Sequence, residues 1–375
     1  MANRLSHSQA NLYLECPKKY SYSYREKIRE KTRSGALILG SAVDLMFSEL
    51  LMSRDKAKAR EVYDKAMNFT EINGRQLAVP TSEFIVYGRS DFDYEVLNQA
   101  QEDKLRSRCE DFGFDPEQAL VTVANIGGKK AAVGWWGLTV NERKYYNLAN
   151  WYCTYNKGLL MLDALEEQVV PLIGTVEALQ KKIELKNTDG DTVLGFLDLL
   201  CIWNDGRRLL LDLKTSGRAY EKDAVATSQQ LVIYQEALAQ EGIVVDAVGY
   251  IVLIKQLVKN RKKICKSCGY APEETTRHRT CPRDILTLRC GGEWNEVLDP
   301  KIKVQILIDR IPERSKDLIL ENIDSINDAI SKEIFVRNTK SCMGTYGKCA
   351  YFDLCWQGKM DGLEIVETIE KKEVV

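Results

Sequence analysis

Two apolar runs that flank a polar turn at residues 204–206 constrain the fold of this chain most strongly. A short polar turn between two apolar runs predicts a β-hairpin. The second run carries Asp212 and Lys214, which are two residues apart and therefore point to the same face of a strand. The first run carries Asp198, which we expect to end its strand opposite them. The hairpin would thus gather two carboxylates and one ammonium among leucines.

Such a group of side chains has a chemical use. Two carboxylates at one site can hold Mg²⁺ or Mn²⁺, which also attract phosphate oxygens. The metal lowers the pKa of a bound water and stabilises charge on a phosphate under attack. Lys214 would then orient that water or stabilise the developing anion. The alternative reading is a surface hairpin with one ordinary ion pair between Asp212 and Lys214.

Three spaced motifs follow one another in this part of the chain: Gly195-x-x-Asp198, Asp212-x-Lys214 and Gln230-x-x-x-Tyr234. Together they resemble the core of the PD-(D/E)XK nuclease superfamily, and most closely its RecB-like branch, which includes the CRISPR-adaptation nucleases and many phage exonucleases. The resemblance implies that the acidic pair binds metal and that the lysine assists the water. It also places Gln230 and Tyr234 in the catalytic set, on a helix near DNA, where their spacing gives them one shared face.

A third carboxylate is implied by the same resemblance. In the RecB-like branch, a histidine follows a Gly-x-x-Val motif and contacts the metal, and here Asp44 holds that place after Gly40-x-x-Val43. Aspartate is also a hard oxygen ligand, so Asp44 is expected to be a third metal ligand. The alternative is a solvated residue on a long helix, which we expect to run from Gly35 to about Met67.

The alternation of strands and helices around the hairpin predicts an α/β fold. The resemblance implies a restriction-endonuclease-like mixed sheet flanked by helices. We expect a strand at 176–185, a helix at 226–239, an apolar strand at 244–254 and helices within 302–335. The domain boundaries that we predict are a helical N-terminal region at 1–175, the nuclease core at 176–258, a zinc-ribbon-like insertion at 259–300, C-terminal helices with a cysteine cluster at 301–360 and a charged tail at 361–375.

The predicted insertion combines cysteines with basic residues. From Lys255 to Cys290 the sequence holds ten Lys/Arg against three Asp/Glu, although the whole chain has a net charge of −1. Four cysteines in this stretch have a spacing that suits tetrahedral Zn²⁺, with His278 as an alternative fourth ligand: Cys265, Cys268, Cys281 and Cys290. The positive charge suits contacts with nucleic-acid phosphates. The alternative is a structural staple with a solvated face.

A second cysteine group joins the two ends of the chain. Cys16 precedes Pro17 in an N-terminal helix for which Ser8 is the expected N-cap, and three cysteines follow near the C-terminus: Cys342, Cys349 and Cys355. The resemblance implies that these four thiolates hold a [4Fe–4S] cluster, as in the cluster-bearing RecB-like nucleases. Zinc at this site is the competing physical reading.

The remaining cysteines and the overall composition indicate the compartment. The chain has eleven cysteines, and we expect Cys109, Cys153 and Cys201 to be buried small hydrophobes rather than disulfide partners. It contains no run of eighteen apolar residues, and the first residues lack the apolar core of a signal peptide. We therefore expect a cytoplasmic protein with no membrane partner.

These observations predict a metal-dependent deoxyribonuclease, an exonuclease on DNA ends or single strands in replication, recombination or repair. The alternative is a non-cleaving subunit that binds DNA ends or single strands within a recombination or CRISPR-adaptation assembly. A third reading is an enzyme that trims ends only within a helicase or CRISPR-adaptation complex. The expected partners in these readings are a helicase, a recombinase or a single-strand-binding protein.

Overall fold

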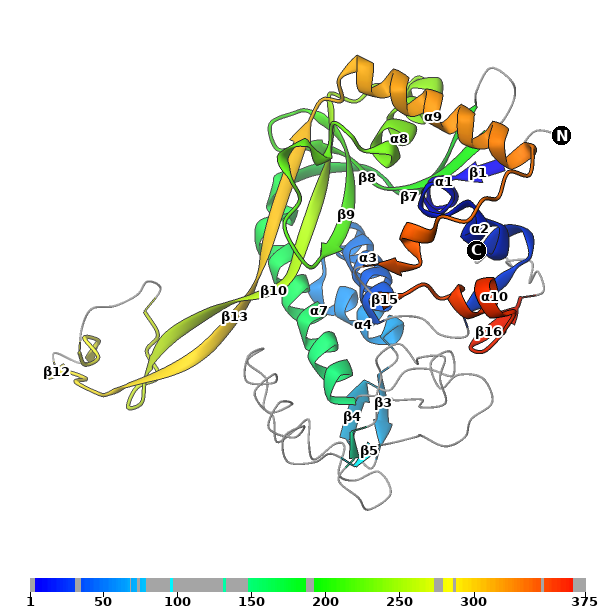
Figure 1. Ribbon diagram of the computed structural model, residues 1–375. Helices are drawn as coiled ribbons and strands as arrows, with labels where there is room; N and C mark the ends of the chain where they lie inside the picture. The colour runs from blue at the N-terminus through cyan, green and yellow to red at the C-terminus, as the bar shows by residue number, and fades with distance from the viewer. Residues whose placement is uncertain are drawn as a thin grey trace.

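A six-stranded mixed sheet forms the centre of the structure, a computed structural model (Figure 1). The residues that the structure describes are 4–30, 35–67, 69–72, 75–78, 95–96, 131–132, 148–186, 192–272, 279–285, 288–344 and 347–366. The strands of the sheet are β1 Arg4–Ser6, β7 Ile173–Lys186, β8 Thr192–Trp203, β9 Arg208–Ser216, β10 Ala247–Cys265 and β13 Trp294–Asp309. β1 runs parallel to β8 and β9 runs parallel to β10, whereas the other neighbours are antiparallel.

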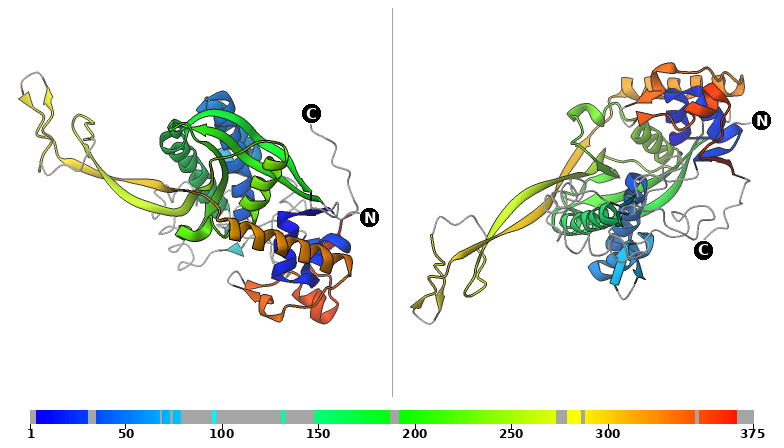
Figure 2. Two further views of the ribbon diagram at one scale, coloured as in Figure 1. Left: turned by 90° about the horizontal axis from the view of Figure 1, so that it is seen from above. Right: turned by 60° about the horizontal axis from the view of Figure 1, so that its bottom comes forward.

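Helices cover both faces of this sheet. The helices on one face are α3 Gly35–Ser53, α4 Lys56–Ala66 and α7 Leu148–Gln168, and those on the other are α1 His7–Glu15, α8 Gln229–Gln240 and α9 Glu313–Ser331 (Figures 1 and 2). The alternation along β9 separates two cores: Leu209 and Leu211 pack towards α3 and α7, and Leu210 packs towards α8. This confirms the predicted α/β fold with a mixed sheet flanked by helices.

The predicted hairpin is present, with one difference. β8 and β9 are antiparallel neighbours, and Gly206 in the turn between them has a φ of 88°, which a glycine adopts without strain. We expected Asp198 to end the first strand, but β8 continues to Trp203. The strand continues because its last residues still pair with β7, where Trp203 lies opposite Ile173. Asp198 therefore sits in the middle of a strand.

Three expected helix limits are wrong. Ser6, rather than Ser8, caps α1, because its hydroxyl accepts the N–H of Gln9 in a capping box. The helix expected from 35 to 67 is interrupted at Arg54, which has a φ of 54°, and Asp55 caps a new helix. Residues 302–309 belong to strand β13 rather than to a helix, because they pair with β10 in the sheet.

Helix α3 is apolar because it lies in the core. By length and composition alone, the window Ala36–Ser53 is long and apolar enough to span a membrane, with a mean hydropathy of 1.6. Half of that window is buried, and Val43, Met46 and Phe47 are at most 2 % exposed. The apolar character of α3 is thus that of a helix packed on a sheet.

The two ends of the described chain lie side by side (Figure 1). α2 Pro17–Tyr20 and α10 Phe352–Gln357 flank a two-stranded pairing of β2 Ile28–Glu30 with β16 Leu363–Ile365. The other short pairings are β3 Phe69–Ile72 with β4 Arg75–Ala78, β5 Glu95–Val96 with β6 Ala131–Ala132, β11 Asp284–Ile285 with β12 Leu288–Arg289, and β14 Met343–Gly344 with β15 Gly347–Lys348. Remaining helical turns cover Ser21–Arg25, Val170–Leu172, Lys222–Ala224 and Thr339–Ser341.

A two-stranded arm extends from the sheet, as Figures 1 and 2 show from three directions. We define it as residues 257–302, because β10 and β13 remain paired from Leu257 opposite Ile302 to Cys265 opposite Trp294. β9 pairs with β10 only as far as Ile254, so the arm has no third strand among the described residues. The predicted cysteine-bearing insertion is thus the far end of two core strands.

The packing of α7 gives a test of the fold. Leu165 is completely buried between α7 and the sheet, so Leu165→Ala should lower the free energy of unfolding by about 2–5 kcal/mol. The matched change Leu45→Ala removes a side chain that is 50 % exposed on α3 and should cost about 1 kcal/mol or less. Urea denaturation measures both values. Equal losses would show that α7 does not cover the core.

Candidate active site and cysteine sites

The hairpin opens where its carboxylates meet. β8 and β9 pair only from Ile202 opposite Arg208 to Leu199 opposite Leu211, and one residue further along β8 lies Asp198. Its Oδ2 accepts the backbone N–H of Leu213 at 2.9 Å, so a side chain satisfies a donor that the neighbouring strand leaves free. The carboxylate of Asp198 is therefore fixed at the point where the two strands separate.

Asp212 is held from two sides. The ammonium of Lys214 lies 2.5 Å from its Oδ2, and the amide of Gln230 on α8 donates to its Oδ1 at 2.6 Å. The same amide lies 3.2 Å from the hydroxyl of Tyr234, one helical turn further along. Asp212 is only 1 % exposed, and its Oδ2 makes no well-directed hydrogen bond despite the nearby ammonium. A buried carboxylate oxygen without a directed donor is a candidate ligand for a cation.

Gly195 allows α8 to approach the strand. A Cβ atom built at this position would lie 2.3 Å from Cε1 of Tyr234, which is closer than any side chain tolerates. The glycine of the Gly195-x-x-Asp198 motif and the tyrosine of the helix are thus parts of one contact. This contact sets the distance between α8 and the acidic pair.

A further polar residue, Gln180, joins the site, and the sequence reasoning missed it. The amide of Gln180 on β7 donates to both carboxylate oxygens of Asp44, at 3.1 and 3.0 Å. Gln180 lies across from Asp198, between the pairs Leu179–Leu199 and Lys181–Leu197. Its φ of 48° is a left-handed conformation that costs a residue with a side chain free energy, and such strain is often kept at functional sites. Its only sequence signal is a polar residue within a strand.

The carboxylates repel one another in a buried environment. Burial and the charge of Asp198 raise the pKa of Asp212 to about 7. Burial and Asp198 also raise the pKa of Asp44 to about 7, although Lys214 and Gln180 oppose the increase. Burial raises the pKa of Asp198 as well. Burial alone would lower the pKa of Lys214, but Asp212 and Asp198 more than offset it and keep the ammonium charged.

Among the residues that the structure describes, Lys214 is the cation that acts on all three carboxylates, so the ionised site carries an excess of negative charge. A divalent cation would remove that excess, and carboxylate oxygens are the donors that Mg²⁺ and Mn²⁺ prefer. The donor chemistry of Asp44, Asp198 and Asp212 suits such an ion, although the ligand atoms of the three carboxylates do not all lie within 4.8 Å of one another.

An open cavity of about 460 Å³ adjoins Lys214. Its lining comes from α1, α8, α9 and the sheet: His7, Asn11, Leu14, Lys214, Thr227, Ser228, Gln229, Gln230, Tyr250, Ile319 and Asn322. This lining contains hydroxyl, amide and imidazole groups but no carboxylate. Burial and the charge of Lys214 lower the pKa of His7 to about 4, so its imidazole is neutral at neutral pH. No motif or spacing in the sequence singles out His7.

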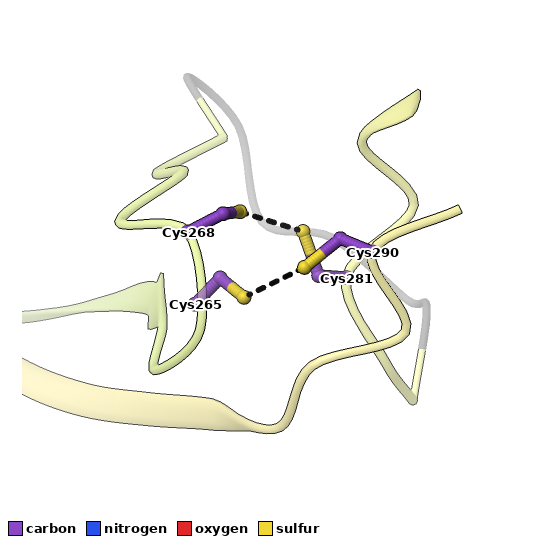
Figure 3. Close-up of side chains that lie close together, drawn as sticks. All are labelled: Cys265, Cys268, Cys281 and Cys290. Carbon is purple, nitrogen blue, oxygen red and sulfur yellow. Dashed lines mark hydrogen bonds between the residues drawn. The ribbon is translucent and has the colours of Figure 1, made fainter. Parts of the chain in front are cut away.

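Four cysteines gather at the end of the arm, and Figure 3 shows their sulfurs facing one another. The Sγ atoms of Cys265 and Cys290 are 3.6 Å apart, those of Cys268 and Cys281 are 3.7 Å apart, and all four lie within 4.8 Å of one another. A tetrahedral Zn²⁺ with Zn–S bonds of about 2.3 Å requires S–S separations of about 3.8 Å. The group therefore has the dimensions of a single-metal site.

Cys281 and Cys290 are brought together by backbone hydrogen bonds rather than by a second C-x₂-C motif. Backbone hydrogen bonds from Cys281 to Gly292 and from Gly291 to Cys281 bring two cysteines together that are nine positions apart in sequence. Gly291 has a φ of 61°, which matches the φ of 68° at Gly269 after the first cysteine pair. His278 lies outside the described residues, and the four cysteines form the group without it.

The other four cysteines line one cavity. Cys16 and the late cysteines Cys342, Cys349 and Cys355 line this cavity between the two ends of the chain. Arg337 Nε lies 3.2 Å from Sγ of Cys355, and the backbone N–H of Asn338 donates to Sγ of Cys16 at 3.5 Å. Among the described residues, only the group at the end of the arm has ligand atoms within 4.8 Å of one another, so these four sulfurs surround a wider space.

All nine cysteines that the structure describes are free, and Cys201 is buried as expected. The side chains of Cys109 and Cys153 lie outside the described residues. Two glutamates near the site lie apart from the acidic pair: Glu177 pairs with Arg208 at 2.9 Å, and Glu184 pairs with Lys182 at 2.9 Å. The roles of the site residues remain predictions, whereas their placement is an observation.

Comparison with known families identifies the class of protein. The model of the PD-(D/E)XK nuclease superfamily matches residues 4–117 and 146–355, which is most of the chain. The chain therefore belongs to the PD-(D/E)XK nuclease superfamily, whose members are usually nucleases that use divalent metals such as Mg²⁺ or Mn²⁺. The central mixed sheet with flanking helices is consistent with the restriction-endonuclease-like fold of that superfamily. Comparison with curated proteins gives no significant match.

The raised pKa of Asp44 predicts a pH-dependent stability. Its pKa rises from the ordinary 3.8 to about 7 on folding, so its contribution to stability is present below about pH 4 and is lost as the pH rises through 7. This pKa difference corresponds to a loss of roughly 4 kcal/mol in the free energy of unfolding at high pH. An Asn side chain at position 44 avoids this loss but gives up one hydrogen bond to Gln180, which costs about 1 kcal/mol. Asp44→Asn should therefore stabilise the protein at pH 8 by up to roughly 3 kcal/mol.

Urea denaturation at pH 5 and pH 8, without added divalent cation and with the cysteine sites loaded, measures this difference. The matched control is Asp205→Asn, because Asp205 is exposed in the hairpin turn and Arg207 lowers its pKa. The control should show no gain at pH 8. An Asp44→Asn protein no more stable than the parent at pH 8 would contradict the electrostatic account.

Proposed function

We propose that this protein is a metal-dependent deoxyribonuclease that acts on DNA ends or single strands. The observation that supports the proposal best is the opening of the β8–β9 hairpin, where Asp198, Asp212 and Lys214 meet beside an open cavity. Membership of the nuclease superfamily supports the reaction class. The preference for ends or single strands is part of the proposal.

Asp198 and Asp212 would hold Mg²⁺ or Mn²⁺, with Asp44 as a third ligand. When bound, the ion would activate water as a Lewis acid and neutralise charge on the phosphate. The protein's own contribution is the fixed position of these oxygens: Leu213 anchors Asp198, Gln230 anchors Asp212, and Gln180 anchors Asp44. Fixed ligands of this kind need no reorganisation during the reaction.

Lys214 would place a positive charge at the reacting phosphate. Its ammonium touches Asp212 and also lines the cavity, so it faces both the acidic pair and the space that a phosphodiester would enter. There it can orient the attacking water or stabilise the developing anion. Gln230 and Tyr234 would keep Asp212 in position and contact the substrate at the same edge.

The cavity suits a strand of nucleic acid. Its neutral hydroxyl and amide groups can bond to phosphate, sugar and base edges, and the lining has no carboxylate that would repel a phosphate. The cavity is lined by Lys214 and Gln230, the two residues that contact Asp212, so a phosphate within it would lie close to the acidic pair. We propose that an unpaired strand occupies it.

A second candidate is a non-cleaving subunit that binds DNA ends or single strands within a recombination or CRISPR-adaptation assembly. The observation that favours it is Asp44, which stands where the RecB-like branch has a histidine. Binding of DNA without metal-stimulated cleavage would support this candidate over the nuclease.

Removal of either group at the hairpin should abolish cleavage. We expect Asp212→Asn and Lys214→Met to reduce the Mn²⁺-dependent degradation of end-labelled single-stranded DNA by at least about 100-fold, because each removes a charge at the reacting phosphate. The matched control Asp205→Asn changes an exposed aspartate of the same hairpin and should retain the parent rate. An Asp212→Asn protein that degrades this DNA at the parent rate would contradict the proposal.

We also propose that the wider cysteine site holds a [4Fe–4S] cluster and that the site on the arm holds Zn²⁺. A cluster binds each thiolate through a different iron and so needs its cysteines farther apart than a single zinc does. The cavity between the chain ends has this wider arrangement, with donors from Arg337 and Asn338 on two sulfurs. The cluster would have a structural role, because it would fasten the N-terminal helices to the C-terminal segment.

Metal analysis distinguishes the two cysteine sites. Anaerobically purified protein should contain about four irons and one zinc per chain. Cys342→Ser should lose iron and keep zinc, whereas Cys268→Ser should lose zinc and keep iron. Two zinc ions per chain, with no iron, would contradict the assignment of the cluster.

A further inference from the structure

The arm at residues 257–302 has no role in the active site described above, yet it begins beside that site. On β10, Tyr250 lies opposite Asp212 and Val252 lies opposite Lys214 in the parallel pairing with β9. The arm starts five residues after Val252, beyond the bulge at 254–257. The strand that leads into the arm is therefore the direct neighbour of the strand that carries Asp212 and Lys214.

The arm is basic in a chain that is otherwise acidic. It contains ten Lys/Arg and six Asp/Glu, a net charge of +4, while the rest of the chain carries −5. Lys255 and Lys303 add two cations at its base. Several of the basic side chains are exposed, both at the base and near the end: Lys301, Lys303, Arg279 and Arg283. One ion pair, between Lys266 and Glu293 at 3.0 Å, neutralises part of this charge.

The arm leaves the core abruptly. Ile302 is 3 % exposed at its base, whereas Val258, one residue beyond the pair Leu257–Ile302, is 43 % exposed. From Leu257 to Cys265 the strands pair without a further bulge. At about 3.3 Å per residue this length is roughly 26 Å. The four cysteines close its far end, so a bound metal would keep the two strands together.

A two-stranded charged arm of this length matches double-stranded DNA better than a single strand. A duplex is stiff over far more than 26 Å and presents phosphates every 3.4 Å along each strand, so roughly eight base pairs would lie beside the arm. Binding of unpaired bases would need exposed aromatic rings for stacking. The described aromatic residues at the end of the arm, Tyr270 and Trp294, are instead half-buried and lie near each other, with ring centroids 6.5 Å apart.

We propose that the arm holds the duplex part of the substrate, over about eight base pairs, while an unpaired strand from that duplex enters the active site. This inference rests on the proposed function, because it takes DNA as the substrate. The arm thereby makes a junction between double-stranded and single-stranded DNA the preferred substrate. Its contacts are with phosphates, so they carry charge recognition and no sequence preference.

The test measures DNA affinity against duplex length in the full-length, metal-loaded chain carrying Asp212→Asn to prevent cleavage. The probes are DNA hairpins with a ten-nucleotide single-stranded tail and stems of 4, 8, 12 and 16 base pairs, and the tail alone. We expect affinity to rise about tenfold between stems of 4 and 12 base pairs and then to level off.

Charge reversal at different points along the arm should weaken binding to stems of different lengths. Arg279→Glu with Arg283→Glu, at the far end, should remove the gain from longer stems and reduce the slope of log affinity against log salt by about 2. Lys301→Glu with Lys303→Glu, at the base, should weaken binding even to the 4-base-pair stem. The matched control is Lys58→Glu on α4, an exposed lysine outside the arm, which should bind all probes as the parent does.

The outcomes separate this inference from the proposed function. An affinity that does not depend on stem length would overturn the role of the arm. The same would follow if the Arg279→Glu, Arg283→Glu protein lost as much affinity for the single-stranded tail alone as for the tailed hairpins. In that case the parent could still degrade single strands. Conversely, a parent that cuts no DNA with Mn²⁺ but shows the stem-dependent binding would refute the nuclease and keep the arm as a duplex-binding element.

Discussion

The opening of the β8–β9 hairpin is the feature on which the site depends. Two strands that paired along their whole length would bury their backbone groups in a ladder and leave no space for a ligand. Here the ladder stops after Leu199 and Leu211, and the carboxylate of Asp198 accepts the N–H of Leu213 instead. The backbone stays satisfied while the strands diverge. Asp212 and Lys214 then lie on the face that α8 covers, close enough for Gln230 to reach Asp212.

This arrangement stores an electrostatic imbalance. Buried carboxylates of like charge destabilise the folded chain unless they are protonated or a cation joins them. Asp44 and Asp212 show the effect as a pKa of about 7. The surrounding structure maintains the imbalance: Gly195 admits the ring of Tyr234, and Gln180 keeps a left-handed backbone to reach Asp44. The two cysteine groups lie elsewhere, one between the two ends of the chain and one at the end of the arm.

Local sequence patterns predicted the hairpin, the α/β alternation and the grouping of the cysteines at 265–290, because each depends on neighbouring residues or on motif spacing. They failed where long-range pairing decides the outcome. Residues 302–309 were expected to be helical, but the edge of β10 recruits them as a strand. Gln180 was missed because only its register opposite Asp198 brings it to the site. The zinc-ribbon-like insertion was expected after the core strand, and the structure adds that β10 and β13 remain paired along it. No local signal reports a strand that extends beyond its sheet.

The most direct test of the account is calorimetric titration of Mn²⁺ into the protein at pH 6 and pH 8, in buffers that differ in their heat of ionisation. If Asp44 and Asp212 have raised pKa values and bind the ion, Mn²⁺ should displace protons at pH 6 and few or none at pH 8. The Asp198→Asn, Asp212→Asn protein should bind the ion far more weakly at both values. Equal Mn²⁺ affinity in this variant and the parent, or no proton release at pH 6, would contradict the central claim.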